Sequence, residues 1–169
     1  MTTLVMTVPH SGTHFLLKFL VATLGLDGHS ALLKQFSKES NFDFIHIHPD
    51  AGDDPTSLCD SLILTLRHPH ETVKTGKWAG NKSEQVVDSW QAMIDISDKY
   101  KKVLTLVIDG PIENRYPQLM AIAEHFGKSH LEPQIKKYAE DWEPVNQSIT
   151  ESDKLNVQFA VEKYKQWQQ

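Results

Sequence analysis

Short, mostly apolar runs alternate along the chain with longer segments in which apolar residues recur every three or four positions. The short runs are typical of strands buried on both faces, and they cover residues 4–8, 42–48, 62–66 and 103–108. The periodic segments predict amphipathic helices. The first carries Phe15, Leu16, Phe19, Leu20 and Leu24 on one face. Others are expected from about residue 70 and over residues 83–101, 116–126 and 152–167.

Strands that alternate with helices predict an α/β protein, with helices on both faces of a mainly parallel sheet in three layers, α/β/α. The length of 169 residues fits one domain over residues 1–169, large enough to bury a core without disulfides. The clearest loop is 50–56, and a polar connection is expected around residues 37–41. The segment 132–150, which contains two prolines, is expected to be the most irregular later region.

The turn between the first strand and the first helix reads Pro9-His10-Ser11-Gly12-Thr13-His14-Phe15. It opens a helix, where backbone N–H groups lack intrahelical partners and the helix dipole is positive, so a phosphate or sulfate group is a natural ligand. Gly12 permits close approach, and Ser11 and Thr13 add hydroxyl donors. An ordinary helix cap remains the alternative. The turn lacks the second glycine and the lysine of a Walker A loop, which disfavours an ATP or GTP hydrolase.

Two further polar clusters follow later strands of the predicted sheet. His46 and His48 alternate near the end of one strand, so their side chains share a face. Arg67 comes directly after another strand, where it can bind a phosphate through two parallel hydrogen bonds, with Thr75 nearby on the next helix. Ligands of parallel sheets gather beyond the carboxyl ends of strands. The alternatives are a surface ion pair for Arg67, and metal ligation or a plain polar strand end for the histidines.

The first turn and the Arg67 segment together resemble the sulfotransferases that use 3′-phosphoadenosine 5′-phosphosulfate. That family has a P-loop-like turn, P-[KR]-S-G-T-[TS]-[WF], and a later strand that ends in R-x-P with a Ser eight residues beyond the Arg. Here the strand 62–66 runs into Arg67-His68-Pro69, and Thr75 takes the place of the Ser. The segment from Val103 to Gly127 is more loosely similar to the family's fourth strand and following helix.

The resemblance implies a P-loop NTPase-like sulfotransferase fold and a role for each matched residue. His10, Ser11, Gly12, Thr13, His14 and Phe15 would hold the 5′-phosphosulfate side of the nucleotide, with Phe15 against the adenine unless it is a core residue. Arg67 and Thr75 would hold the 3′-phosphate. His48 aligns with the family's general base, and a pKa near neutrality suits it to remove a hydroxyl proton. No metal is required, and the by-product would be adenosine 3′,5′-bisphosphate.

The chain departs from the family at two places. His10 stands where the family has Lys or Arg to steady charge on the sulfuryl group, so it must be protonated or act as a neutral donor. The R-K-G-x-x-G-D-W segment that adds 3′-phosphate contacts in cytosolic members has no counterpart. A nucleotide-binding protein with weak or no catalysis is therefore the alternative function. A metal-dependent hydrolase using His46, His48, His68 and His70 is a third hypothesis.

Composition narrows the possible partners. The chain has 22 acidic and 17 basic residues and a net charge of −5, which argues against broad binding to nucleic acid or an anionic membrane. Cys59 is the only cysteine, so no disulfide forms within the chain. The first residues lack the basic segment of a secretory signal, and we expect a cytoplasmic protein. The acceptor, whether small molecule, glycan or peptide, and the oligomeric state stay open.

Overall fold

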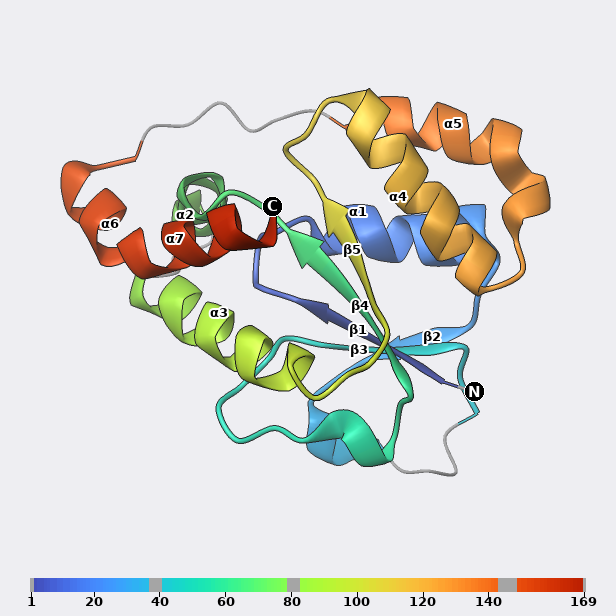
Figure 1. The fold of residues 1–169 in the computed structure, drawn as a ribbon, viewed down its shortest axis with the longest axis horizontal. Coiled ribbons are helices and arrows are strands. Elements are labelled where there is room, and N and C mark those ends of the chain that lie inside the picture. Colours follow the sequence, from blue (N-terminus) through green and yellow to red (C-terminus); the bar gives the residue numbers. More distant parts are fainter. Residues whose placement is uncertain (1, 37–40, 79–82, 143–148, 169) are drawn as a thin grey trace.

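A five-stranded, entirely parallel sheet forms the centre of the protein (Figure 1). The computed structural model describes residues 2–36, 41–78, 83–142 and 149–168. The strand order is β2-β3-β1-β4-β5. The strands are β1 (Thr3–Thr7), β2 (Gly28–Ser30), β3 (Phe44–Ile47), β4 (Ser61–Leu66) and β5 (Val103–Val107).

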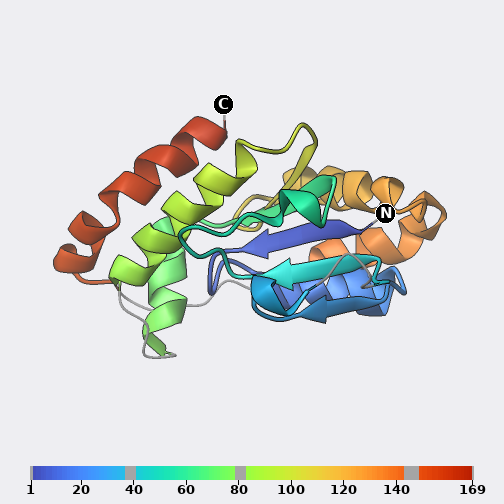
Figure 2. The same cartoon turned by 90° about the horizontal axis from the view of Figure 1, so that it is seen from below.

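Helices cover both faces of this sheet (Figures 1 and 2). On one face lie α1 (Thr13–Lys18), its π-helical continuation η1 (Phe19–Thr23), α4 (Ile112–His125) and α5 (Glu132–Glu140). On the other lie α2 (Pro69–Trp78), α3 (Ser83–Ser97), α6 (Glu151–Asn156) and α7 (Gln158–Trp167). Short 3₁₀ turns are η2 (Leu33–Gln35), η3 (Pro55–Ser57) and η4 (Ser129–Leu131).

The two hydrophobic cores follow directly from strand alternation. Along β1, Leu4 and Met6 pack against α2, α3 and α7, whereas Val5 packs against α1, α4 and α5. Because both faces are covered, the strands consist of near-continuous apolar runs, as the sequence predicted. The prediction of an α/β protein with a parallel sheet is confirmed.

The chain leaves the neighbouring strands β1 and β4 toward opposite faces of the sheet. After β1 it forms α1 on one face, and after β4 it forms α2 on the other. Such a divergence opens a crevice at the carboxyl ends of the two strands, which is where ligands bind in open parallel sheets. The fold therefore places the segment after Val8 and the segment after Leu66 on the two sides of one crevice.

Some boundaries differ from the prediction for identifiable reasons. β2 was not expected, because it is short and polar. It packs closely because Gly28 has no side chain: a Cβ there would lie 2.1 Å from Cζ of Phe44. Residues 132–140 form a helix although irregular structure was expected there. Pro133 falls in the first turn, where proline is tolerated, and Ile135, Tyr138 and Ala139 are buried.

Other elements are shifted or divided. The helix expected over 116–126 begins at Ile112, and the one expected over 152–167 is interrupted at Val157, between α6 and α7. Residues 37–40 of the expected polar connection, and 143–148 of the expected irregular region, lie outside the described residues. None of the helices in the described ranges is both long enough and apolar enough to cross a membrane.

Candidate functional site

The α1 face of the sheet changes from apolar to polar toward the carboxyl ends of its central strands. Polar residues replace the core residues of this face at the last or next-to-last position of each strand and just beyond it. The polar residues are Thr7, His46, His48, Thr65 and Arg67. Except for His48, all of them are almost completely buried. A polar layer in this position indicates a site, because buried polar groups are costly unless they are paired.

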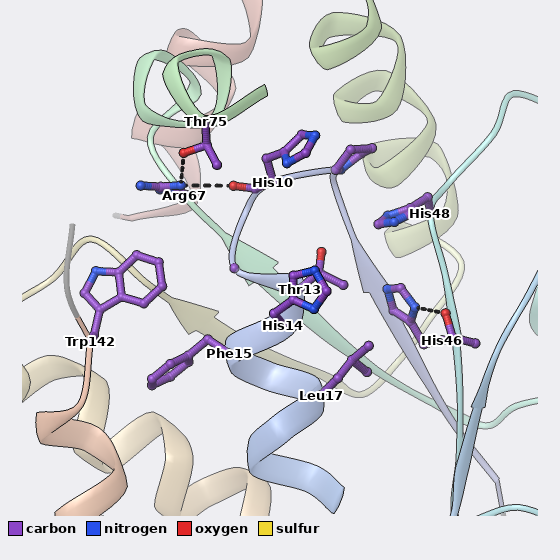
Figure 3. A pocket seen from close by; sticks show the side chains of 13 residues that line it. His10, Thr13, His14, Phe15, Leu17, His46, His48, Arg67, Thr75 and Trp142 are labelled. Atoms are coloured by element: carbon purple, nitrogen blue, oxygen red, sulfur yellow. Dashed lines mark hydrogen bonds between the residues drawn. The ribbon is translucent and has the colours of Figure 1, made fainter. Parts of the chain in front are cut away.

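A cavity of about 610 Å³ opens onto this layer (Figure 3). It is lined by every residue expected to bind the nucleotide except Ser11, and by His48. The structure therefore brings together the three polar clusters that follow β1, β3 and β4. The cavity is also lined by His46 and by four residues that were not assigned to the site from the sequence, which are Pro9, Leu17, Ser30 and Trp142.

The loop after β1 is held in an unusual backbone conformation. His10 and Gly12 both have positive φ angles, of 63° and 99°. The Ser11 N–H donates to the Val8 carbonyl over 3.0 Å, which closes the turn. The first helical hydrogen bond runs from the Leu16 N–H to the Gly12 carbonyl, so the N–H groups of residues 13–15 precede it. All three of these residues, Thr13, His14 and Phe15, line the cavity beside Gly12.

The two hydroxyls of this loop have different positions. The Ser11 side chain is 1% exposed, and its Oγ lies 2.8 Å from Oγ1 of Thr65, inside the sheet. The Thr13 hydroxyl lies 2.8 Å from Oγ1 of Thr7 and belongs to the cavity wall. Of the two hydroxyls expected to face an anion, only that of Thr13 is placed to do so; Ser11 instead ties the loop to β4.

Arg67 is the largest polar side chain buried at the cavity, with 2% of its surface exposed. Its Nε donates to Oδ1 of Asp109 over 3.2 Å, and its Nη1 donates to the His10 carbonyl and to Oγ1 of Thr75 over 3.1 and 2.7 Å. Its Nη2 is buried and has no hydrogen-bond partner among the described residues. The ring of Trp142 lies 5.3 Å from the guanidinium carbon. A buried cationic donor without a partner is a group prepared for a ligand.

Two residues hold Arg67 in this position. Thr75, in α2, accepts from Nη1 and donates its own hydroxyl to the Glu71 carbonyl over 3.1 Å. Asp109 follows β5 and also accepts from the His68 N–H, so it fixes the chain just beyond β4. Burial raises the pKa of Asp109, and the neighbouring Arg67 guanidinium and His68 N–H act in the opposite direction. The sequence alone gave Asp109 no role at the site.

The two histidines of β3 occupy different environments. His46 is 1% exposed, and its ring nitrogens lie 2.8 Å from Oγ1 of Thr7 and 2.7 Å from Oγ of Ser30. Burial, together with nearby His48 and His14, lowers the pKa of His46 to about 3, so it is neutral. His48 is exposed, and its Nδ1 lies 2.8 Å from the Thr7 carbonyl oxygen. A carbonyl only accepts, so Nδ1 carries the proton and Nε2 of a neutral His48 keeps its lone pair.

His10 takes the loop position where the sulfotransferases that the sequence resembles have Lys or Arg. Burial lowers the pKa of His10, and His48, Arg67 and His14 lower it further. In the absence of a bound anion, the neutral form is therefore favoured. The sequence left open whether His10 is protonated or acts as a neutral donor, and the lowered pKa favours the neutral donor.

Aromatic side chains form one wall of the cavity. Phe15 packs against Tyr138 and Trp142, with ring centroids 4.7 and 5.5 Å apart. The Tyr138 hydroxyl donates to the Phe15 carbonyl over 2.7 Å and anchors α5 to α1. Phe15 is thus both a packing residue and a cavity residue. Trp90 is a core residue on the opposite face of the sheet.

The geometry offers little support for a metal site. In the ranges that the structure describes, no three His, Cys, Asp or Glu side chains gather as metal ligands would. His68 and His70 pack against each other, and His68 packs against Tyr164. Neither of them lines the cavity that holds His46 and His48.

Comparison of the sequence with protein-family models gives no match, and comparison with curated proteins gives no significant match.

Proposed function

We propose that the chain has the P-loop-like sulfotransferase fold and moves a sulfuryl group from 3′-phosphoadenosine 5′-phosphosulfate to a hydroxyl or amine acceptor. The observation that carries the proposal is the buried Arg67 guanidinium, whose Nη2 has no partner among the described residues while Nη1 binds Thr75. A phosphate supplies oxygens that satisfy such a group through strong, charge-assisted hydrogen bonds. Arg67 and Thr75 are therefore assigned to the 3′-phosphate.

The loop after β1 is assigned to the 5′-phosphosulfate. Its residues line the same cavity as Arg67, and the N–H groups of residues 13–15 together with the Thr13 hydroxyl are donors of the kind that an anion requires. Donors fixed by the backbone need no reorganisation as charge develops on the leaving phosphate. Phe15 and Trp142 offer aromatic surfaces to the adenine on the same wall.

His48 is assigned as the general base. Its Nδ1–H donates to the Thr7 carbonyl, which orients the ring and leaves Nε2 free to take the acceptor's proton. In the reaction the acceptor oxygen or nitrogen forms a bond to sulfur, and the bond from sulfur to the bridging phosphate oxygen breaks. The acceptor's proton passes to Nε2 of His48, and adenosine 3′,5′-bisphosphate leaves with the electron pair of the broken bond.

A nucleotide-binding protein without transfer is the second candidate. The specific observation in its favour is His10, whose pKa is lowered where active sulfotransferases hold a permanent cation. The two functions share the binding site and differ only in turnover.

The first test is calorimetric and thermal-shift titration with adenosine 3′,5′-bisphosphate, with AMP as the comparison ligand. Binding should stabilise the protein by about 2.7 kcal/mol at a hundredfold excess over Kd. Arg67→Lys should remove the preference for the 3′-phosphate, because an ammonium cannot keep the contacts with Asp109 and Thr75 and also place a donor where Nη2 lies. Lys74→Ala is the matched control, since it removes a cation that pairs with Glu71 and does not line the cavity.

Either outcome of this titration is informative. Tighter binding of the bisphosphate than of AMP, lost in Arg67→Lys and kept in Lys74→Ala, supports the site. Equal affinity for both ligands in the wild-type protein overturns the proposal. Where binding is specific, transfer from 3′-phosphoadenosine 5′-phosphosulfate to a panel containing a phenol, a monosaccharide and an amino sugar separates the sulfotransferase from the binding protein.

A further inference from the structure

A continuous chain of hydrogen bonds joins two separate parts of the cavity wall beneath its surface. Oγ of Ser30 lies 2.7 Å from Nδ1 of His46, whose Nε2 lies 2.8 Å from Oγ1 of Thr7, which lies 2.8 Å from Oγ1 of Thr13 (Figure 3 shows the first of these bonds). Thr7 and His46 are 0 and 1% exposed. Ser30 and Thr13 at the two ends both line the cavity, Ser30 beside the β3 histidines and Thr13 in the anion loop.

The protons of these hydrogen-bonded groups can be arranged in two ways that satisfy all three bonds. Each hydroxyl donates one proton, and a neutral imidazole carries one N–H. Burial lowers the pKa of His46 to about 3, so the imidazole is neutral in both arrangements. With the proton on Nε2, His46 donates to Thr7, Thr7 donates to Thr13, and Ser30 donates to His46. With the proton on Nδ1, every one of these bonds reverses.

The two arrangements present different groups to the cavity. In the Nε2–H arrangement the Thr13 proton is free to point into the anion loop, and Ser30 offers only lone pairs. In the Nδ1–H arrangement the Thr13 proton is committed to Thr7, and Ser30 has the free proton. Phosphate and sulfate oxygens accept hydrogen bonds and do not donate them, so an anion in the loop binds the first arrangement better.

We propose that an anion in the loop sets His46 to the Nε2–H tautomer through Thr13 and Thr7, and thereby makes Ser30 a hydrogen-bond acceptor for the molecule to be sulfated. This inference rests on the proposed function, since it takes the anion to be the 5′ end of the nucleotide. It adds a binding residue for the acceptor, Ser30, and names what that residue recognises, an O–H or N–H donor on the acceptor. It also couples the two substrates, because the acceptor side is completed when the nucleotide is bound.

The His46 tautomer can be read directly by long-range ¹H–¹⁵N NMR of the protein labelled at histidine. Saturation with adenosine 3′,5′-bisphosphate should shift the ratio of tautomers toward Nε2–H by about tenfold or more, the effect of one hydrogen bond to a charged acceptor. Thr13→Val keeps the side-chain shape and removes the hydroxyl, so the bisphosphate, at a concentration that saturates the weakened site, should no longer shift the ratio. Ser30→Ala should leave His46 as Nε2–H in the complex, because Thr7 still accepts from it.

The controls separate this inference from the proposed function. Failure of the bisphosphate to bind overturns the proposed function, and inorganic sulfate at high concentration then serves as the probe of the loop. The proposed coupling is overturned if His46 carries its proton on Nδ1 when the protein is saturated with either probe. It is also overturned if Thr13→Val shows the same shift as the wild-type protein, or if neither probe changes the ratio of His46 tautomers.

Discussion

Gly12 faces the side chain of Ile108 so closely that the loop after β1 packs directly on the residue that follows β5. A Cβ on Gly12 would lie 2.6 Å from Cγ1 and 2.8 Å from Cδ1 of Ile108. The φ angle of Gly12 is 99°, a conformation that L side chains rarely adopt. Two independent constraints therefore require glycine here, and both arise from the packing of the loop rather than from contact with a ligand.

Gly12→Ala should lower the free energy of unfolding by about 2–4 kcal/mol, as the sum of left-handed strain and overpacking against a fully buried side chain. The measurement is urea unfolding followed by circular dichroism. Gly25→Ala is the matched control, because Gly25 also has positive φ but a Cβ there meets nothing within 4 Å. It should cost about 1–2 kcal/mol. Equal losses in the two variants would show that Ile108 makes no difference.

His48→Asn should abolish most of the transferase activity without weakening nucleotide binding. The Asn side-chain amide can donate to the Thr7 carbonyl as Nδ1 does, but it has no basic nitrogen to accept a proton. A positioned general base contributes about 10²–10⁴-fold, and kcat should fall by that amount. Transfer rates and the Kd for adenosine 3′,5′-bisphosphate, measured on the same preparation, test this. Unchanged turnover would remove His48 from the mechanism, and a large loss of affinity would show a binding role instead.

The sequence predicted those parts of the site whose residues lie within one short segment of the chain. The resemblance to the sulfotransferase motif paired Arg67 with Thr75, and the structure joins them over 2.7 Å. His46 and His48 were placed on one face by strand alternation, and both line the cavity. The predicted strands and the parallel sheet followed from apolar runs, which report burial on both faces.

The remainder of the site depends on contacts between distant segments. Asp109 is 42 positions from Arg67, and Trp142 is separated from the loop by most of the chain, so no local pattern connects them. Ser30 lies on a strand too short and polar to be recognised, and its partner His46 is 16 positions away. Ser11 carried the expected residue type, but whether its hydroxyl turns to the cavity or to Thr65 is decided by packing.

Acid should destabilise the protein through His46. The pKa of His46 falls from its ordinary value of 6.5 to about 3 on folding, chiefly through burial. The unfolded chain therefore binds the proton more readily, so the stabilising contribution of His46 is complete above pH 6.5 and is lost as the pH falls toward 3. One such group changes the free energy of unfolding by up to about 1.4 kcal/mol per pH unit.

Urea unfolding at several pH values between 8 and 5 measures this slope. The Gln side chain of His46→Gln cannot titrate. The free energy of unfolding of this variant should therefore change less steeply with pH than that of the wild-type protein, by the equivalent of up to one proton. Other histidines with lowered pKa, such as His68 and His125, titrate in both proteins and cancel in the difference. Parallel slopes in the two proteins would mean that His46 is not held neutral by the fold.

Nucleotide affinity should rise as the pH falls, because His10 takes up a proton when an anion binds beside it. Burial and the neighbouring positive groups lower the pKa of His10 in the free protein, and a bound phosphate favours the charged form again. The Kd for adenosine 3′,5′-bisphosphate should therefore decrease from pH 8 to pH 5.5, by at most about tenfold per pH unit for this one site.

His10→Asn is the suitable variant, since Asn tolerates the positive φ of this position but carries no charge. It should retain the protein's fold and show a flatter dependence on pH. A dependence as steep as that of the wild-type protein would show that the proton is not taken up by His10, which would then act in the loop only as a neutral donor.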